Sequence, residues 1–481
     1  MTQAIEKVVI VVFDGLRPDM IAGRMPHLEA FARESLWYRE ARSVFPSVTR
    51  VATTSFATGN WPGTHGIINN AFHQPQVLNG KAIDTGSFDH LSLAQERTGE
   101  LVTAGSLGQA LAARGLSMAA VHCGTAGAAY LVNHKAAANG HATFSVQGEA
   151  FSQTPQAVRE VIARLGPLPG KDIPKFDVVD YAGRAMEQVV LGADQPDVSL
   201  VWLPEPDTSF HYREIGSDAS RAVMGAADEV FGRILDAVRT GPHADRTAVV
   251  AMSDHGQITI TDQIDLAGLM AADGLTAATA PGPDTEIALT LGNSGELRML
   301  ADDPALVLRA AEWLMSRDEI GMVFARDDLA PGIPGALPLA LVHQSHARAP
   351  ELFYVMRADD GADLHGLPGR TLCSGGPQVG GGMHGGLNRH EMNTTLMISA
   401  PGVARGEMSA APCALIDIAP TVLSLLGVAP DGMAGRALAR DGATAAAPET
   451  ERLQAGQGAF SQYLVRRHAE GRVYLDRGGR D

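Results

Sequence analysis

KVVIVVFDG, residues 7–15, is the stretch that decides the fold. A strand with one face in water alternates apolar and polar residues, whereas residues 8–13 are apolar without interruption and mostly β-branched. This pattern predicts a strand buried on both faces, as in a parallel sheet covered by helices. Asp14 follows the strand directly, at the end where open α/β sheets place their ligands.

Two later apolar runs end in the same way. Residues 198–203 (VSLVWL) lead into EPD with Asp207, and residues 248–252 (AVVAM) lead into SDHG with Asp254. Parallel strands have their carboxyl ends at one edge of a sheet, so we expect Asp14, Asp207 and Asp254 to share one site. The fold class predicted is therefore α/β, with a central, mostly parallel sheet flanked by helices.

Helical patterns and further strands surround these runs. Helices are expected at residues 26–36, 51–58, 106–114, 181–191, 218–238, 304–316 and 416–426, and other strands at 287–291, 296–300, 321–325, 352–357 and 395–399. We expect a core of residues 1–262 and 383–440, an inserted α+β cap at 263–382, and a peripheral C-terminal tail at 441–481. Residues 460–465 could still pack on the body.

Composition limits the classes of function. The 481 residues are 45% hydrophobic and 19% charged, which suits a large folded core. A formal charge of −16 argues against binding to duplex nucleic acid or an anionic membrane, although bound cations can still hold a small anionic substrate.

Cysteine usage and the N-terminus bear on the compartment. Cys123, Cys373 and Cys413 form no CxxC pair, which favours a reducing compartment. The run at 8–13 is too short for a signal peptide, and no stretch approaches the roughly 20 apolar residues of a membrane span. We therefore expect a soluble, cytoplasmic protein that acts on a small molecule, and leave open whether it forms a homo-oligomer.

The strand-end motifs carry metal-binding residue types. Asp207 and His211 are four residues apart, so one helical turn would let both reach a cation. Asp254 and His255 are adjacent, and Gly256 would provide the turn that aims both at one ion. Each motif alone is more often a surface pair or a turn, but their shared position after core strands favours a metal site.

Thr49 is the candidate nucleophile. It lies in FPSVTR, just before the helix expected from residue 51, where backbone N–H groups and the helix dipole suit a phosphoryl group. The alternative is that Ser47 or Thr49 is only the helix N-cap.

FPSVTRVATTSFATGNWPGTHGI, residues 45–67, resembles the nucleophile segment of the nucleotide pyrophosphatase/phosphodiesterase branch of the alkaline phosphatase superfamily. The order of motifs is also similar, from Asp14 through Thr49, EPDTSFH, SDHG and a late HG, and ALIDIAPTVLSLLGV (414–428) resembles the superfamily's closing helix. The resemblance implies phosphodiester hydrolysis through a covalent phosphothreonine at Thr49.

The resemblance also implies the ligands of two metal ions. One ion would be held by Asp207, His211 and His384, and the other by Asp14, Asp254, His255 and the Thr49 oxygen. Mixed nitrogen and oxygen ligands suit Zn²⁺, with Mn²⁺ as the alternative. The neighbouring His65, His390 and Glu391 are interpreted as supporting or structural residues.

The chain departs from the family pattern after the nucleophile. Ala52 stands where the family usually has an Asn that donates to a phosphoryl oxygen, and Arg50 directly follows Thr49. Arg50 could replace that donor or point to solvent, and both orientations remain open.

Other functions within the fold therefore stay under consideration. A phosphomonoesterase and a hydrolase of carbon–phosphorus bonds are the nearest, and a non-catalytic binding protein is the alternative from another class. A sulfatase is disfavoured because Cys123 lies in CGTAG rather than in the C/S-x-P-x-R element of that branch, and a phosphomutase because it usually carries a Ser nucleophile.

Overall fold

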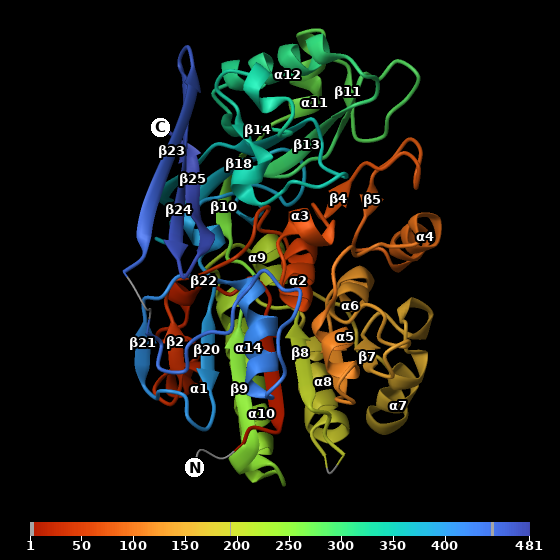
Figure 1. Cartoon of the computed structure of the whole chain (residues 1–481), viewed down its shortest axis with the longest axis vertical. Coiled ribbons are helices and arrows are strands. Elements are labelled where there is room, and N and C mark those ends of the chain that lie inside the picture. The colour runs from red at the N-terminus through yellow and green to blue at the C-terminus, as the bar shows by residue number, and fades with distance from the viewer. Residues whose placement is uncertain (1–3, 193, 444–446) are drawn as a thin grey trace.

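An eight-stranded sheet forms the centre of the computed structural model, which describes residues 4–192, 194–443 and 447–481 (Figure 1). Its strand order is β21-β2-β20-β9-β1-β8-β6-β7. The bounds are β21 Glu407–Ser409, β2 Leu36–Tyr38, β20 Leu396–Ser399, β9 Thr247–Met252, β1 Lys7–Phe13, β8 Val198–Leu203, β6 Met118–His122 and β7 Ala142–Ser145. Of these eight strands only β20 is reversed, so the mostly parallel sheet is confirmed.

The apolar side chains of β1 pack into two layers of core, one on each face of the sheet. Val8, Ile10 and Val12 belong to one buried cluster, and Val9, Val11 and Phe13 to another on the opposite face. The first cluster includes side chains of α2 (Thr49–Thr58), α5 (Leu107–Ala112) and α14 (Ile418–Leu425). The second includes side chains of α1 (Pro26–Ala32), α7 (Pro155–Leu165), α8 (Phe176–Ala185) and α10 (Asp218–Thr240). The result is a helix–sheet–helix arrangement.

The three runs that end at acidic residues are neighbours in this sheet. β1 lies between β9 and β8, and both pairings are parallel with residues in direct register. Their carboxyl ends therefore meet at one edge, as expected.

Several sequence-based boundaries are corrected. The helix expected at 26–36 ends at Ala32, because Leu36–Tyr38 pairs with β20 and β21 as a strand. The helix expected at 181–191 begins at Phe176 and passes into a π-helical turn at Met186–Val190. Strands β6 and β7 were not expected, because alanine-rich MAAVH and short ATFS carry little strand signal.

Residues 258–383 build two more sheets above the core (Figure 1). Six strands have the order β11-β12-β13-β16-β14-β15, with bounds Ala277–Ala278, Ile287–Leu289, Ser294–Met299, Leu352–Met356, Ile320–Ala325 and Leu337–Pro338. Helices α11 (Leu266–Ala272) and α12 (Pro304–Ser316) pack on them through a separate buried cluster. The other sheet joins β17 (Ala358–Ala362), β18 (Pro368–Cys373), β10 (Ile258–Gln263) and β19 (Gly382–Met383).

The C-terminal segment, expected as a peripheral tail, carries an antiparallel sheet. Its strands are β23 (Glu449–Gln457), β24 (Phe460–Ala469) and β25 (Arg472–Arg480). Phe460, Leu464 and Leu475 are buried against clusters of the 258–383 region, and Tyr474 against the core. The sheet thus joins the two parts of the molecule.

Candidate metal centre

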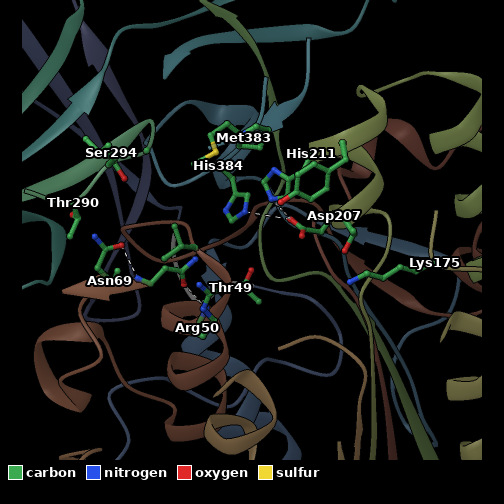
Figure 2. Close-up of a pocket in the computed structure, with 18 residues that line it drawn as sticks. Thr49, Arg50, Asn69, Lys175, Asp207, His211, Thr290, Ser294, Met383 and His384 are labelled. Carbon is green, nitrogen blue, oxygen red and sulfur yellow. Dashed lines mark hydrogen bonds and ion pairs between the residues drawn. The ribbon is translucent and has the colours of Figure 1, made fainter. Parts of the chain in front are cut away.

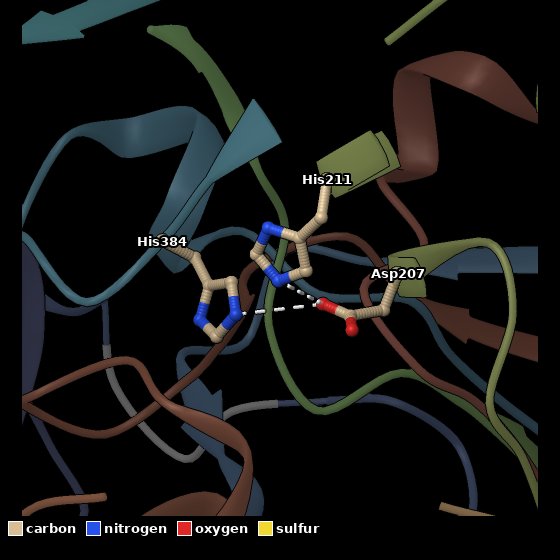
Figure 3. Close-up of side chains that lie close together, drawn as sticks. All are labelled: Asp207, His211 and His384. Atoms are coloured by element: carbon tan, nitrogen blue, oxygen red, sulfur yellow. Dashed lines mark ion pairs between the residues drawn. The ribbon is translucent and has the colours of Figure 1, made fainter. Parts of the chain in front are cut away.

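The carboxyl edge of the central sheet gathers the six predicted metal ligands into two groups. Asp14 directly follows β1, Asp254 and His255 follow β9, and the ligand atoms of these residues lie within 4.8 Å of one another. The second group has the same spacing and comprises Asp207, His211 and His384 (Figure 3). Each group offers carboxylate oxygen and imidazole nitrogen.

Asp207 and His211 come together as their spacing predicts. Asp207 begins the short helix α9 (Asp207–Arg213), and one turn later His211 Nε2 lies 3.3 Å from Asp207 Oδ1. His384 follows β19, and its Nε2 lies 3.4 Å from the same oxygen. Gln257, which sequence reasoning missed, donates a hydrogen bond to Asp207 Oδ1.

The two groups adjoin each other. The rings of His255 and His384 stack with centroids 3.6 Å apart, and His255 Nε2 lies 3.2 Å from Asp254 Oδ2 and 3.6 Å from Asp14 Oδ1. Two ions held by these groups would therefore be close neighbours, which is the arrangement of two-metal hydrolases.

Backbone carbonyls fix the orientation of all three histidines. Nδ1 of His211 donates to Gly382 O at 2.7 Å, and Nδ1 of His384 donates to Ser47 O at 2.8 Å. Nδ1 of His255 lies 3.1 Å from Gly256 O. A proton on Nδ1 leaves the Nε2 lone pair facing the carboxylates, which is how metal-ligating histidines are usually held.

Each of the two buried carboxylates of the first group has one oxygen without a hydrogen-bond partner among the described residues. Asp14 is 5% exposed and Asp254 is fully buried, and Asp14 Oδ1 and Asp254 Oδ2 have no hydrogen-bond partner within the described part of the chain. Burial raises the pKa of Asp254 to about 8. Burial and the charges of Asp254 and Asp207 raise the pKa of Asp14 well above its usual range. A cation would stabilise both as carboxylates, so the donor set fits a metal ion.

The second group is electrostatically different. Burial opposes ionisation of Asp207, but His211 and His384 outweigh it and hold the pKa of Asp207 well below its usual range. Burial lowers the pKa of His384. Burial and the neighbouring His384 ring lower the pKa of His255. Both rings are therefore neutral and available as ligands.

Two other contacts position the first group. Trp202 Nε1 donates to Asp14 Oδ2 at 2.9 Å, and Gly15 N donates to Asp254 Oδ1 at 3.0 Å. Gly15 has φ +74°, and a Cβ there would lie 3.0 Å from Asp207 Cβ. The sequence suggested that position 256 is glycine because of a turn. In the structure a side chain at this position would collide with the backbone oxygen of His390, so close packing requires the glycine.

Thr49 is the first residue of α2 and lies at the first group. Its Oγ1 is 3.1 Å from His255 Nε2, and the side chain lines a cavity of about 400 Å³ (Figure 2). No side-chain cap satisfies the start of α2, so the N-cap interpretation is not supported for Ser47, whose Oγ donates to Gly386 O instead.

Arg50 faces the same cavity. Figure 2 shows it beside Thr49, across from His384 and His211. Its Nε is buried without a partner, and its side chain makes no ion pair within the described residues. The guanidinium is therefore available to an anionic substrate.

Two asparagines at the cavity were missed by sequence reasoning. Asn69 and Asn70 line it, and Asn70 Oδ1 accepts a hydrogen bond from Arg50 N at 3.1 Å, which leaves the Nδ2 group of Asn70 as a donor. They stand about 20 positions after Thr49, so no local spacing indicates them. Ala52 is fully buried and packs in the core instead.

His65, His390 and Glu391, interpreted from sequence as supporting or structural, are not members of the two ligand groups. His65 contacts Ser55 Oγ at 2.8 Å, and His390 Nδ1 contacts Arg17 Nη2 at 3.2 Å. Glu391 accepts a hydrogen bond from Gly386 N, two residues after His384.

The fold is that of the alkaline phosphatase superfamily, and its edge of carboxylates and histidines offers two candidate metal sites. The chain belongs to the type I phosphodiesterase/nucleotide pyrophosphatase family, whose sequence profile matches residues 8–356. It is therefore an enzyme rather than a non-catalytic binding protein, and the family implies phosphodiester hydrolysis. Members of this family typically depend on two metal ions.

Solved structures with this fold include ectonucleotide pyrophosphatase/phosphodiesterase 5 of mouse and human. An inactive form of the mouse protein in complex with AMP matches with a TM-score of 0.61 at 15% identity, over 89% of this chain and 97% of that one. The human protein matches with a TM-score of 0.60 at the same identity and coverage. At this identity the likeness shows the fold alone. No curated protein matches the chain by sequence.

Proposed function

We propose that the chain hydrolyses a phosphodiester through a covalent phosphothreonine at Thr49. The observation that carries this proposal is the position of Thr49 Oγ1, 3.1 Å from His255 Nε2 and at the wall of the 400 Å³ cavity. A nucleophilic hydroxyl needs a free approach to the substrate, which the cavity wall gives Thr49, and a neighbour that favours its deprotonated form, which an ion held beside it by Asp14, Asp254 and His255 would supply.

The metal ligands in this proposal are the two groups described above. Asp14, Asp254 and His255 with the Thr49 oxygen would hold one ion, and Asp207, His211 and His384 the other. Such ions lower the pKa of a hydroxyl and neutralise the charge that develops on phosphoryl oxygens. The mixed nitrogen and oxygen donors favour Zn²⁺, with Mn²⁺ as the alternative.

The chain's own residues orient the reacting groups. Thr49 Oγ attacks phosphorus as the bond to the leaving oxygen breaks, and the electron pair departs on that oxygen. Arg50, the Asn70 amide and the start of α2 provide donors to the phosphoryl oxygens. Water then displaces Thr49 from phosphorus, so two inversions give net retention.

A second candidate is hydrolysis of a phosphomonoester or a phosphonate. The observation in its favour is the unpaired Arg50 guanidinium at the cavity, because a group with close to two negative charges gains more from a cation than a diester does.

Thr49→Ala tests the nucleophile. We expect it to retain the fold and the metal content but to lose turnover of bis-4-nitrophenyl phosphate, because the attacking oxygen is gone. Acid quenching of the native enzyme during turnover is expected to yield a Thr49 peptide heavier by one phosphoryl group. Activity close to that of the native enzyme in the variant would exclude Thr49 as the nucleophile.

Metal removal tests the two-ion centre. Dialysis against a chelator is expected to abolish turnover, and Zn²⁺ is expected to restore it at two ions per chain, because neither the hydroxyl nor the developing charge is stabilised without them. Restoration by Mn²⁺ but not by Zn²⁺ would change the metal assignment. Full activity in the metal-free protein would refute the mechanism.

We further propose the domain division and the location expected from sequence. A core of 1–262 and 383–440 with a cap at 263–382 agrees with the separate buried clusters, whereas the 441–481 segment contacts both parts. Within the described residues no helix is long and apolar enough to span a membrane. The free, buried Cys123, Cys373 and Cys413 support a cytoplasmic location.

A further inference from the structure

Ser47 lies two residues before Thr49, in the stretch that leads into α2. Its side chain is fully buried, and the sequence suggested for it only the role of a helix N-cap. In the structure three hydrogen bonds instead join Ser47 to the loop after β19, which carries His384. Ser47 thus connects the segment of the candidate nucleophile to a candidate metal ligand that is more than 300 positions away in the sequence.

The three hydrogen bonds use both the carbonyl and the hydroxyl of Ser47. The carbonyl oxygen accepts from His384 Nδ1 at 2.8 Å. The hydroxyl accepts from Gly385 N at 3.1 Å and donates to Gly386 O at 2.9 Å. Both glycines are buried, and these two backbone groups have no other hydrogen bond within the described residues. The hydroxyl therefore satisfies two buried backbone groups and holds the Ser47 carbonyl against the His384 ring.

This short stretch contacts one histidine of each ligand group. Ser47 receives the hydrogen bond from His384 of the second group, and Thr49 Oγ1 lies 3.1 Å from Nε2 of His255 of the first group. The two imidazole rings stack with centroids 3.6 Å apart. The position of the loop on Ser47 therefore decides where the His384 ring stands relative to His255 and Thr49.

The opposite side of the loop is held by β13. Ser294 Oγ donates to Gly385 O at 2.9 Å. Gly385 has φ +129°, and a Cβ there would lie 2.9 Å from Ser294 Oγ and 3.1 Å from Val48 Cγ1. The loop is thus clamped between β13 and the start of α2, and Ser47 provides the hydrogen bonds on the side of the nucleophile.

We propose that Ser47 is a positioning residue for the second metal group. Its hydroxyl holds the loop so that His384 Nε2 faces Asp207 Oδ1, 3.4 Å away, and thereby sets the affinity for the ion of that group (Figure 3). Ser47 itself is buried behind the ligands and does not line the cavity. The inference rests on the two-ion centre of the proposed function and adds to it a residue that supports a ligand.

Zinc affinity tests the inference without turnover. Binding of Zn²⁺ to metal-free native protein and to metal-free Ser47→Ala is measured by competition with a chromophoric chelator. Loss of a residue that orients a metal ligand typically weakens metal binding by about ten- to hundredfold. We expect Ser47→Ala to bind one ion as tightly as the native protein does and the other more weakly by this factor. Native affinity for both ions, or equal weakening of both, would overturn the inference.

A double-mutant cycle shows whether Ser47 acts through His384. His384→Ala is expected to weaken the second ion strongly, and adding Ser47→Ala to it is expected to change zinc binding little further, because the positioned ring is already absent. If Ser47→Ala weakens zinc binding as much in the His384→Ala background as in the native protein, the inference is overturned.

Ser409 provides the matched control for stability. It is a buried serine on the edge strand β21, and its Oγ also accepts from a backbone N–H, that of Ala411 at 3.1 Å, and donates to a glycine carbonyl, that of Gly442. Ser409→Ala is expected to lower the urea midpoint about as much as Ser47→Ala while both ions keep their native affinity. If Ser409→Ala weakens zinc binding as much as Ser47→Ala does, the effect is one of stability alone and the inference is overturned.

The zinc dependence of turnover separates this inference from the proposed function. With bis-4-nitrophenyl phosphate, we expect the Zn²⁺ concentration for half-maximal activity to rise about ten- to hundredfold in Ser47→Ala, with an unchanged plateau, because Ser47 supports a ligand and touches no reacting atom. A lower plateau at an unchanged midpoint would overturn the inference. Absence of turnover in the native protein at every Zn²⁺ concentration would refute the proposed function instead, and the binding measurements would then decide the inference.

Discussion

Arg50 and Ala52 stand two positions apart on α2 and face opposite environments. Ala52 is fully buried in the core cluster, so an asparagine there would place its amide among apolar side chains rather than at a phosphoryl oxygen. Arg50 lines the cavity of about 400 Å³, and its Nε has no hydrogen-bond partner in the part of the chain that the structure describes. This place at the cavity wall supports contact of Arg50 with a substrate, the alternative to an orientation toward solvent.

Replacing Arg50 distinguishes the ester classes. Arg50→Ala is expected to lower kcat/KM for 4-nitrophenyl phosphate about ten- to hundredfold, since a charge-assisted contact contributes roughly 1.5 to 3 kcal/mol. The loss for the corresponding methyl diester is expected to be smaller, because a diester carries one charge less. Arg50→Lys keeps the charge but not the forked geometry, so it is expected to recover part of the loss. Equal losses for both substrates would show that Arg50 does not discriminate by charge.

At the scale of elements, the sequence predicted the strands that carry the ligands better than those that only border them. The runs of β1, β8 and β9 are mostly apolar, and their acidic ends converge as parallel topology requires. β6 has no such run, although it pairs in parallel with β8. Asn70 reaches Arg50 through the fold of the intervening chain, which leaves no periodic signal.

The short helix α13 (Arg389–Met392) braces the loop that carries His384. Glu391 accepts hydrogen bonds from Gly386 N at 2.9 Å, from Asn388 N at 3.1 Å and from Asn293 Nδ2 at 2.6 Å. One buried carboxyl therefore ties the His384 loop to the end of the neighbouring sheet. Because the group is fully buried, its ionisation has a cost.

The stability of the fold is expected to depend on pH through Glu391. Burial raises its pKa from 4.5 to about 7, so between these values the folded carboxyl keeps a proton that the unfolded one has lost. The stabilisation is fully present below pH 4.5 and is lost as pH rises through about 7. Between pH 4.5 and 7 the unfolding free energy of the native protein is therefore expected to fall by about 3 kcal/mol through this group. Glu391→Gln cannot titrate and is expected to lack this fall.

Urea unfolding of metal-free protein at several pH values measures this effect. Glu312→Gln, on the exposed side of α12, is the matched control and is expected to follow the native protein. A Glu391→Gln curve parallel to the native one would show that Glu391 does not titrate in this range.

At the scale of the whole molecule, the C-terminal sheet packs against both the core and the 258–383 region, whereas the sequence predicted a separate peripheral tail. Its composition of alanine, glycine and arginine predicted a tail, because few positions in it are apolar. Those few are the ones that are buried: Leu464 and Leu475 pack with Phe324 and Phe353 of the six-stranded sheet, and Tyr474 packs with the core. Local composition could not reveal a surface that exists only after both partners have folded.

Leu464→Ala tests whether this sheet is part of the cooperative structure. Leu464 is fully buried, so truncation removes apolar contacts and leaves a cavity, with an expected loss of about 2 to 5 kcal/mol in unfolding free energy. Thr450→Ala, exposed on β23 of the same sheet, is the control and is expected to cost little.

Both variants are measured by urea unfolding of the full chain, followed by tryptophan fluorescence and by release of bound metal. Since the sheet contacts both the core and the six-stranded sheet, we expect the two signals to shift together in Leu464→Ala. A variant that loses fluorescence in a separate early transition while metal release stays at the native midpoint would show that the sheet is an independent attachment, as its composition first indicated.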